Sequence, residues 1–317
     1  MIRALHRWPG LLALALVTIL ALSGAALSVF PAAERLAVPQ AETGLTVAAL
    51  AHRIHAVYPG VEQIRRSPSG RITAYWFDQG APGAAVIDPA TGEGVASADP
   101  NQAERWLTNL HRSLFLGDGG RIAMAAGAAA MLVLSLSGAA LVARRAGGWR
   151  HWFARLRGPL AGRLHVEIGR IAVVGLVLSS TTALWMTAST FDLLPDGGAI
   201  SAAPIEVSGE TGSALDQIPT LQQTPVAELR ELSFPYPGDA TDVFTLKTDR
   251  GTGYLDQGDG ALLAWADLTG WERVSETIYT LHTGQAAAGE HFVRLGCEGL
   301  IAEKETLHDL ALHCAFF

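Results

Sequence analysis

Four histidines at the ends of long apolar stretches are the residues of this chain whose type and spacing indicate chemistry. They are His6, His111, His165 and His282. Imidazole nitrogens bind metals, and a haem iron with two axial imidazoles needs one facing pair for each haem. Spacing alone leaves two interpretations open: two haem sites, or histidines that populate membrane interfaces as Trp and Tyr do. A conventional metal site is disfavoured because no carboxylate or Cys joins the histidines at ligand spacing.

The apolar stretches predict three membrane-spanning helices. Residues 11–30, 122–143 and 171–191 are 20, 22 and 21 residues long and contain no charged side chain. About 20 mostly apolar residues are enough to cross a bilayer core of ~30 Å. A cleaved signal peptide is the alternative for the first stretch, because Arg3 and Arg7 precede it. The stretch is longer than the usual apolar core of about 7–15 residues in such a peptide.

Composition narrows the class of protein. Hydrophobic residues make up 49% of the 317 residues and charged residues 17%, with a formal net charge of −7. This apolar content excludes a disordered chain. The acidic balance, without a basic stripe, argues against binding to nucleic acid. The two cysteines, Cys297 and Cys314, both lie near the C-terminus, so neither a disulfide framework nor a Cys-based zinc or iron–sulfur site is expected.

The arginines predict the orientation of the helices. The loop between the second and third apolar stretches contains no acidic residue and six arginines: Arg144, Arg145, Arg150, Arg155, Arg157 and Arg163. The positive-inside rule places this short loop in the cytoplasm, together with the N-terminus. His6 and His165 are then at the cytoplasmic face, and His111 and His282 at the outer face. In a bacterial inner membrane, the segments after the first and third stretches lie in the periplasm.

The two periplasmic segments predict copies of one small α+β unit. Helical spacing of apolar residues predicts helices over 45–58 in the first copy and 225–232 in the second. The polar residues 201–224 predict a linker. Alternating patterns predict strands over residues 71–77, 84–87, 243–247, 253–255 and 262–265. The expected fold class is an α+β membrane protein, with three transmembrane helices and two small periplasmic α+β units.

The residues around the four histidines resemble the signatures of the PepSY-associated transmembrane family. The matching segments, in the family's order, are LHRWPGL at 5–11, LHRSLFLGDGGR at 110–121, RLHVEIG at 163–169 and LHTGQ at 281–285. The periplasmic units resemble PepSY domains, and the resemblance covers residues 1–285. It implies that His6 with His165, and His111 with His282, hold two haem b groups. Some members of the family reduce ferric siderophores or pass electrons across the inner membrane.

One departure from the family concerns the C-terminus. In the family, a fourth spanning helix follows the fourth signature. Here the sequence continues with charged residues and offers no apolar window of about 20 residues: Glu290, Arg294, Glu298, Glu303, Lys304, Glu305 and Asp309. We therefore expect a tail that is unrelated to the family, as after a truncation or frameshift, and a His282 without the helix that would hold it. One haem b, between His6 and His165, is then expected instead of two.

These expectations divide the chain into seven parts. They are residues 1–30 (N-terminus and first helix), 31–110 (first PepSY-like unit), 111–143 (second helix), 144–163 (basic loop), 164–191 (third helix), 192–285 (second PepSY-like unit) and 286–317 (charged tail). The expected function is electron transfer across the membrane from a cytoplasmic flavoprotein or quinone donor to a periplasmic ferric chelate or other acceptor. The alternative is a membrane-anchored PepSY module that binds or regulates a partner, such as a peptidase, without redox activity.

Overall fold

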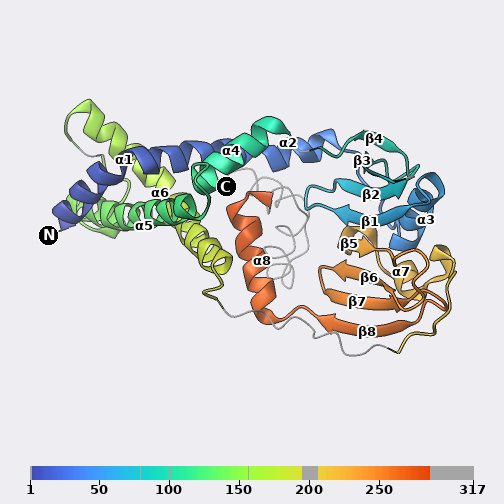
Figure 1. The fold of residues 1–317 in the computed structure, drawn as a ribbon. Coiled ribbons are helices and arrows are strands. Elements are labelled where there is room, and N and C mark those ends of the chain that lie inside the picture. The colour runs from blue at the N-terminus through green and yellow to red at the C-terminus, as the bar shows by residue number, and fades with distance from the viewer. Residues whose placement is uncertain (1, 79, 100, 156, 195–205, 286–317) are drawn as a thin grey trace, which may run out of the picture.

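The computed structural model describes residues 2–78, 80–99, 101–155, 157–194 and 206–285. A bundle of helices occupies one half of the molecule and a large antiparallel sheet the other (Figure 1). The bundle end farther from the sheet carries the arginine-rich loop, and we call it the arginine side. The opposite end is called the sheet side.

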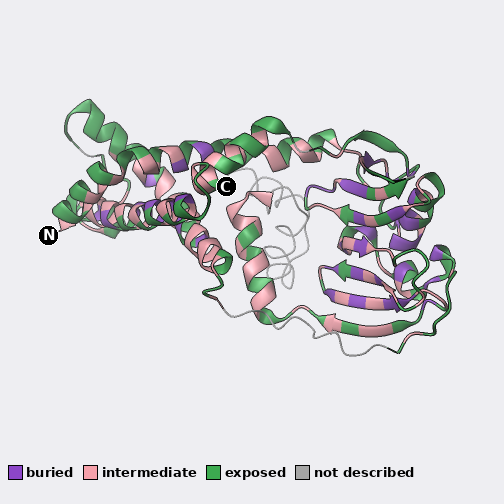
Figure 2. Cartoon of the chain, in the orientation of Figure 1, coloured by how far each residue is buried: buried purple, intermediate pink, exposed green. Residues whose placement is uncertain are grey.

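Three helices of the bundle are long and apolar enough to cross a membrane, which confirms the prediction from the sequence. They are α1 (Ile2–Leu27), which α2 (Val29–Ala37) continues, α5 (Gly117–Ala146) and α6 (Leu160–Thr190). Both α1 and α6 pack against α5. Large apolar side chains such as Leu12, Ile171 and Val174 remain exposed on these helices, and Figure 2 shows the bundle exterior as largely exposed. Apolar surface of this extent is typical of helices that lie in lipid.

Three shorter helices complete this half of the molecule. They are α4 (Gln102–Ser113), the single 3-10 turn η1 (Trp149–His151) in the arginine-rich loop, and α8 (Gly270–His282). On the sheet side, α4 packs against α1 and α5, and α8 packs against α6. Trp185 of α6 and Trp271 of α8 contribute a ring contact of 4.7 Å to the second interface.

All strands of the two predicted units belong to one eight-stranded antiparallel sheet, in the order β4-β3-β2-β1-β5-β6-β7-β8. The first unit supplies β1 (Val61–Arg66), β2 (Ile72–Asp78), β3 (Ala81–Ile87) and β4 (Gly94–Ser97). The second supplies β5 (Leu229–Ser233), β6 (Val243–Thr248), β7 (Gly251–Asp256) and β8 (Leu262–Asp267). The units join where β1 pairs with β5, with Ile64 opposite Leu232. They therefore share a sheet instead of standing apart.

One apolar core beneath this sheet serves both units. From the first, α3 (Val47–Val57) buries Leu50 and Ile54, and its N-cap Thr46 accepts a hydrogen bond from Ala49 N. From the second come the turn η2 (Leu215–Gln217) and α7 (Pro219–Gln223), both in contact with α3. Burial of such side chains stabilises the fold by about 1.5–3 kcal/mol each.

Two local predictions in the second unit are wrong. Residues 225–232, predicted as a helix, form the short turn η3 (Val226–Glu228) and then the central strand β5. Leu229 and Leu232 are buried in the shared core, where pairing with β1 overrides a spacing that also suits a helix. The predicted linker 201–224 contains η2 and α7, whose Leu221 is fully buried.

Each edge of the sheet leads directly to a helix of the bundle. Strand β4 is one edge and is followed by α4, and strand β8 is the other and is followed by α8. Asn101 caps α4, and Thr269 with Glu272 forms a capping box on α8. Both helices run toward the bundle (Figure 1). His111 lies near the end of α4, and His282 is the last residue of α8.

Candidate functional site

The four predicted histidines come together as two pairs, one at each end of the bundle. On the arginine side, the ring centres of His6 and His165 are 6.2 Å apart, with 66° between the ring planes. On the sheet side, the ring centres of His111 and His282 are also 6.2 Å apart, with 40° between the planes. We call these the arginine-side pair and the sheet-side pair.

This separation fits two imidazoles that share one metal from opposite sides. Metal–imidazole bonds are about 2 Å long and a ring nitrogen lies ~1.1 Å from its ring centre, so the centres would be about 6.3 Å apart. Among the described residues, no group of three or more His, Cys, Asp or Glu could hold a metal ion. A haem iron needs only two protein ligands, because the macrocycle fills the other four positions. Both pairs therefore fit a haem better than a bare metal ion.

His6 is held by a serine–glycine dipeptide on the neighbouring helix α5. Its Nδ1 lies 3.0 Å from Ser137 Oγ. The Ser137 hydroxyl donates to Leu134 O of its own helix at 3.3 Å, so its oxygen faces the imidazole as an acceptor. A Cβ on Gly138 would be only 3.0 Å from His6 Cε1. The serine thus favours the tautomer with Nδ1 protonated and Nε2 free, and the glycine leaves room for the ring.

His111 has the same arrangement with a dipeptide on α1. Its Nδ1 lies 2.8 Å from Ser23 Oγ, and the Ser23 hydroxyl donates to Ile19 O at 2.5 Å. A Cβ on Gly24 would be 3.1 Å from His111 Cε1. In each pair, therefore, one histidine (His6 or His111) is positioned by a serine and the glycine that follows it.

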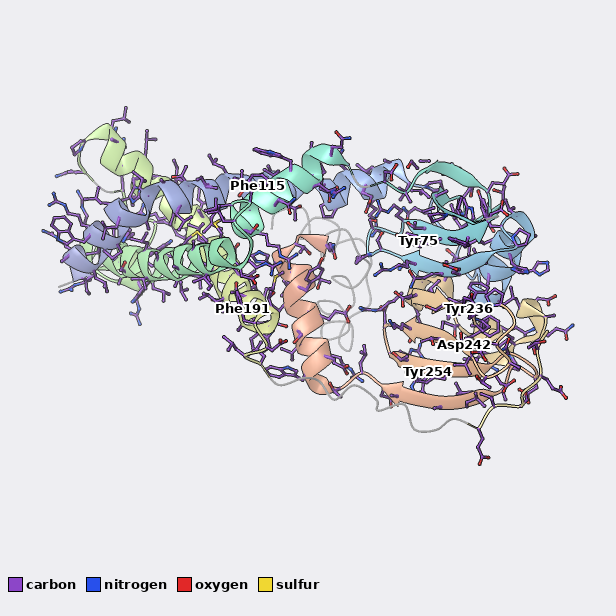
Figure 3. All side chains as sticks on the ribbon, in the orientation of Figure 1. Tyr75, Phe115, Phe191, Tyr236, Asp242 and Tyr254 are labelled. Carbon is purple, nitrogen blue, oxygen red and sulfur yellow. The ribbon has the colours of Figure 1, made fainter. Side chains whose placement is uncertain are left out.

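A tight turn after His111 sets α4 against α5. Leu114 and Phe115 both have left-handed backbone conformations, with φ of 49° and 61°. Such a conformation costs a non-glycine residue about 1–2 kcal/mol, so the surrounding packing must hold it. A Cβ on Gly120 would overlap the carbonyl oxygen of Ser113, which explains the glycine in this part of the second signature. Phe115 lies at the sheet side of the bundle (Figure 3).

The position of His282 corrects an expectation from the sequence. Its Nδ1 lies 2.9 Å from Thr182 Oγ1, whose hydroxyl donates to Leu178 O of α6 at 2.8 Å. Beyond the histidine, a Cβ on Gly284 would meet Ser28, between α1 and α2, at 3.5 Å, which shows how closely this end of α8 approaches the bundle. A helix that precedes His282 and packs on α6 holds the imidazole, so no following helix is needed. Residues 286–317 lie outside the described residues.

His165 differs from the other three histidines. It is exposed at the arginine side, and its ring contacts His6 without a hydroxyl partner among the described residues. Glu167, two residues after His165, binds Arg170 at 2.9 Å. The Arg170 guanidinium also donates to Ala154 O at 2.8 Å. Arg170 thus connects the start of α6 to the arginine-rich loop.

The two pairs lie near opposite ends of the spanning helices. His6 and Ser23, which contacts the other pair, are 17 residues apart on α1. His165 and Thr182 are also 17 residues apart on α6. At 1.5 Å per residue, each spacing corresponds to about 25 Å along the bundle. A bilayer core is ~30 Å thick, so the pairs suit positions near its two faces.

Two of these partners, Ser23 and Ser137, were not predicted from the sequence, although a repeated motif contains both. The hexapeptide Leu-Ser-Gly-Ala-Ala-Leu occurs at residues 22–27 and again at 136–141, and supplies both serine–glycine dipeptides. Thr182 donates to a carbonyl of its own helix, as threonines within helices commonly do, and also binds His282. Among other glycines of the spans, Gly127 meets Leu16 and Leu20, whereas Gly175 faces open space.

Comparison with known families identifies the family of the chain. The family model described as the PepSY-associated TM region matches residues 3–297. The chain belongs to the PepSY-associated TM family. The match includes all four histidines and extends beyond residue 285 into the charged tail. No curated protein matches the chain.

Proposed function

We propose that this PepSY-associated TM protein carries two haem b groups and supports one-electron transfer across a membrane. The observation that carries the proposal is the repeated 6.2 Å separation between facing imidazoles, once at each end of the bundle. A chain that only anchored the sheet would need neither pair. The proposal includes the sheet-side haem, since Thr182 of α6 binds His282 and the two imidazoles of this pair have the same separation as those of the other.

Haem, when bound, supplies the one-electron chemistry at its iron. The chain supplies axial ligands, orientation and a dry environment. Ser23, Ser137 and Thr182 each accept from an imidazole Nδ1–H, which leaves Nε2 free for iron and makes the ring a stronger donor. In a bilayer, the apolar helices α1, α5 and α6 would keep water away from the region between the pairs.

The arginine side is proposed to face the cytoplasm of a bacterium, and the sheet the periplasm, because residues 144–163, from the end of α5 to the start of α6, contain six arginines and no carboxylate. The electron donor would be a cytoplasmic flavoprotein or the quinone pool. The acceptor would be a ferric siderophore or another periplasmic ferric chelate. This orientation is testable by C-terminal fusions: an alkaline phosphatase fusion should be active and a green fluorescent protein fusion dark.

The experiment that tests the function is haem analysis of the purified protein. We expect a low-spin Soret and α band that sharpens with dithionite, and two haem b per chain. Two ferric EPR signals are also expected, because the angle between axial imidazole planes sets the splitting of the iron d orbitals. The pair with planes at 66° should give the larger maximal g value, and the pair at 40° the smaller.

Single histidine variants assign the signals. His6→Ala should remove the signal with the larger g value, and His282→Ala the other, each with the loss of one haem. His52→Ala is the matched control, because His52 is an exposed histidine on α3, far in the fold from both pairs. A colourless protein that still folds and inserts would reject the conduit and favour the binding or regulatory module.

A further inference from the structure

The two histidines of the sheet-side pair lie on helices that directly follow the two opposite edge strands of one sheet. His111 is on α4, which follows edge strand β4, and His282 is on α8, which follows edge strand β8. The two helices converge so that their imidazole centres are 6.2 Å apart. The histidines of the arginine-side pair lie instead on the spanning helices α1 and α6, near the end of the bundle farther from the sheet. A change in the sheet should therefore affect the sheet-side pair more than the arginine-side pair.

A cluster of charged side chains connects α8 to β5, a central strand of the sheet. Arg230, on the central strand β5, forms ion pairs with Glu276 of α8 and with Asp249 of the β6–β7 turn. Glu276 is six residues before His282 on the same helix. The Arg230 side chain is 35% exposed and that of Glu276 28% exposed, so both are partly shielded from water. Arg230 thus connects the junction of the two units to the helix that carries a haem ligand.

A second group of charged side chains lies near α4, the helix that carries His111. Arg71, just before β2, binds Glu34 of α2 at 2.7 Å, and Ser69 donates to the same carboxylate at 2.5 Å. Glu104 of α4 is close enough to both charges for them to affect its pKa. Two charged contacts therefore link the sheet to the helices. The Arg230–Glu276 pair joins β5 to α8, and the Arg71–Glu34 pair lies near α4.

We propose that Arg230 is a positioning residue for the sheet-side haem, acting through Glu276 and α8 on the angle and distance of His282 from His111. This inference rests on the proposed function. It assigns the sheet the task of setting the ligand geometry of one haem, so that a partner or chelate bound to the sheet could alter that haem alone. Arg230 does not touch the imidazoles.

Partly exposed ion pairs contribute little to folding stability, so Arg230→Met should fold and insert. We expect the EPR signal with the smaller maximal g value to shift or broaden, and the haem with that signal to dissociate up to about tenfold faster, the lower limit of the loss that follows removal of a direct partner of a ligand. The other signal should not move. Arg230→Lys should restore most of the wild-type spectrum, because Lys keeps the charge.

Arg250→Met is the matched control, since Arg250 binds Glu228 at 2.6 Å within the sheet domain. An unchanged sheet-side signal in Arg230→Met, or an equal change in both signals or in the control, would overturn the inference and leave the proposed function standing. A folded wild-type protein without haem would instead contradict the proposed function, and this inference with it.

Discussion

The imidazole centres of His111 and His282 lie 6.2 Å apart although the two residues reach this point from opposite edges of an eight-stranded sheet. The same separation occurs between His6 and His165, which lie on spanning helices. Two unrelated routes thus produce the same separation of the imidazoles. This agreement is the main reason to regard both pairs as sites and not as interfacial histidines.

The glycines beside the imidazoles should be more sensitive to substitution than other glycines of the spans. Gly138→Ala places a Cβ 3.0 Å from His6 Cε1, and Gly24→Ala places one 3.1 Å from His111 Cε1. Each ring must move by a few tenths of an ångström, which weakens one iron bond. We expect haem affinity at the affected pair to fall about 10–100-fold, as when a ligand loses its supporting contacts.

Gly175→Ala provides the control, because its Cβ would face open space on α6. This substitution should keep both haems and favour the helix by up to about 1 kcal/mol. Haem release to an apo-globin acceptor gives the rates for all three variants. Equal rates in Gly138→Ala and Gly175→Ala would show that the arginine-side ring is not confined as the structure indicates.

The hydroxyl partners should tune the reduction potential of each haem. Removal of the acceptor for an Nδ1–H makes the imidazole a poorer donor, which destabilises the ferric state. The potential of the arginine-side haem should therefore rise in Ser137→Ala, and that of the sheet-side haem in Ser23→Ala and in the isosteric Thr182→Val. Potentiometric titration with EPR detection separates the two haems. A fall in potential, or a change in the other haem, would contradict the assigned hydrogen bonds.

Much of the fold could be predicted from the sequence, because its strongest signals are physical constraints. A charge-free run of 20 residues has few stable alternatives to a spanning helix, and the four histidine signatures have a fixed order. The shared sheet could not be predicted, since the pairing of β1 with β5 depends on contacts between distant segments. The support of His282 could not be predicted either: the sequence offers no apolar span after it, whereas its partner Thr182 lies on a helix 100 residues earlier in the chain.

Acid should weaken the turn after β7, where Asp256 is buried. The Asp256 carboxylate accepts hydrogen bonds from Ser208 N and Oγ and from Gly258 N, each 2.6 Å long. Burial alone would raise the pKa of Asp256, but these hydrogen bonds hold the pKa below its ordinary value. A lowered pKa gives stability that is present above the ordinary pKa of about 3.9 and is lost as the pH falls through the folded-state value.

Asp256→Asn should accordingly lower the free energy of unfolding at pH 7 by about 1–3 kcal/mol, the range for lost hydrogen bonds to a charged group. The deficit should shrink as the pH falls from about 3.9 toward the lowered folded-state pKa, below which the wild-type carboxyl is itself protonated. Urea unfolding in detergent, followed by tryptophan fluorescence, measures both values. Asp216→Asn, at an exposed aspartate near the same domain's η2 turn, is the control. A deficit that is independent of pH would mean that the charge of Asp256 is not what the hydrogen bonds stabilise.

Glu104 should have the opposite effect on stability. Partial burial raises the pKa of Glu104, the negative charge of Glu34 raises it further, and Arg71 lowers it in part. The folded protein therefore binds this proton more tightly than the unfolded chain does. The resulting penalty is absent below the ordinary Glu pKa of about 4.3, develops as the pH rises, and is complete above the raised folded-state pKa.

We therefore expect Glu104→Gln to increase the thermal stability of the protein in detergent at pH 7 and to leave it unchanged near pH 3.5. Glu34→Gln is a neighbouring comparison with the reverse expectation at pH 7, because Glu34 binds Arg71 at 2.7 Å and Ser69 at 2.5 Å. Glu34, and not Glu104, is the carboxylate bound to Arg71. Replacement by an uncharged residue should therefore stabilise the protein at Glu104 and destabilise it at Glu34. Differential scanning fluorimetry across pH 3.5–8 tests both variants. Destabilisation of the protein by Glu104→Gln at pH 7 would show that Arg71 pairs with Glu104 in solution and that the attachment near α4 is shared by both carboxylates.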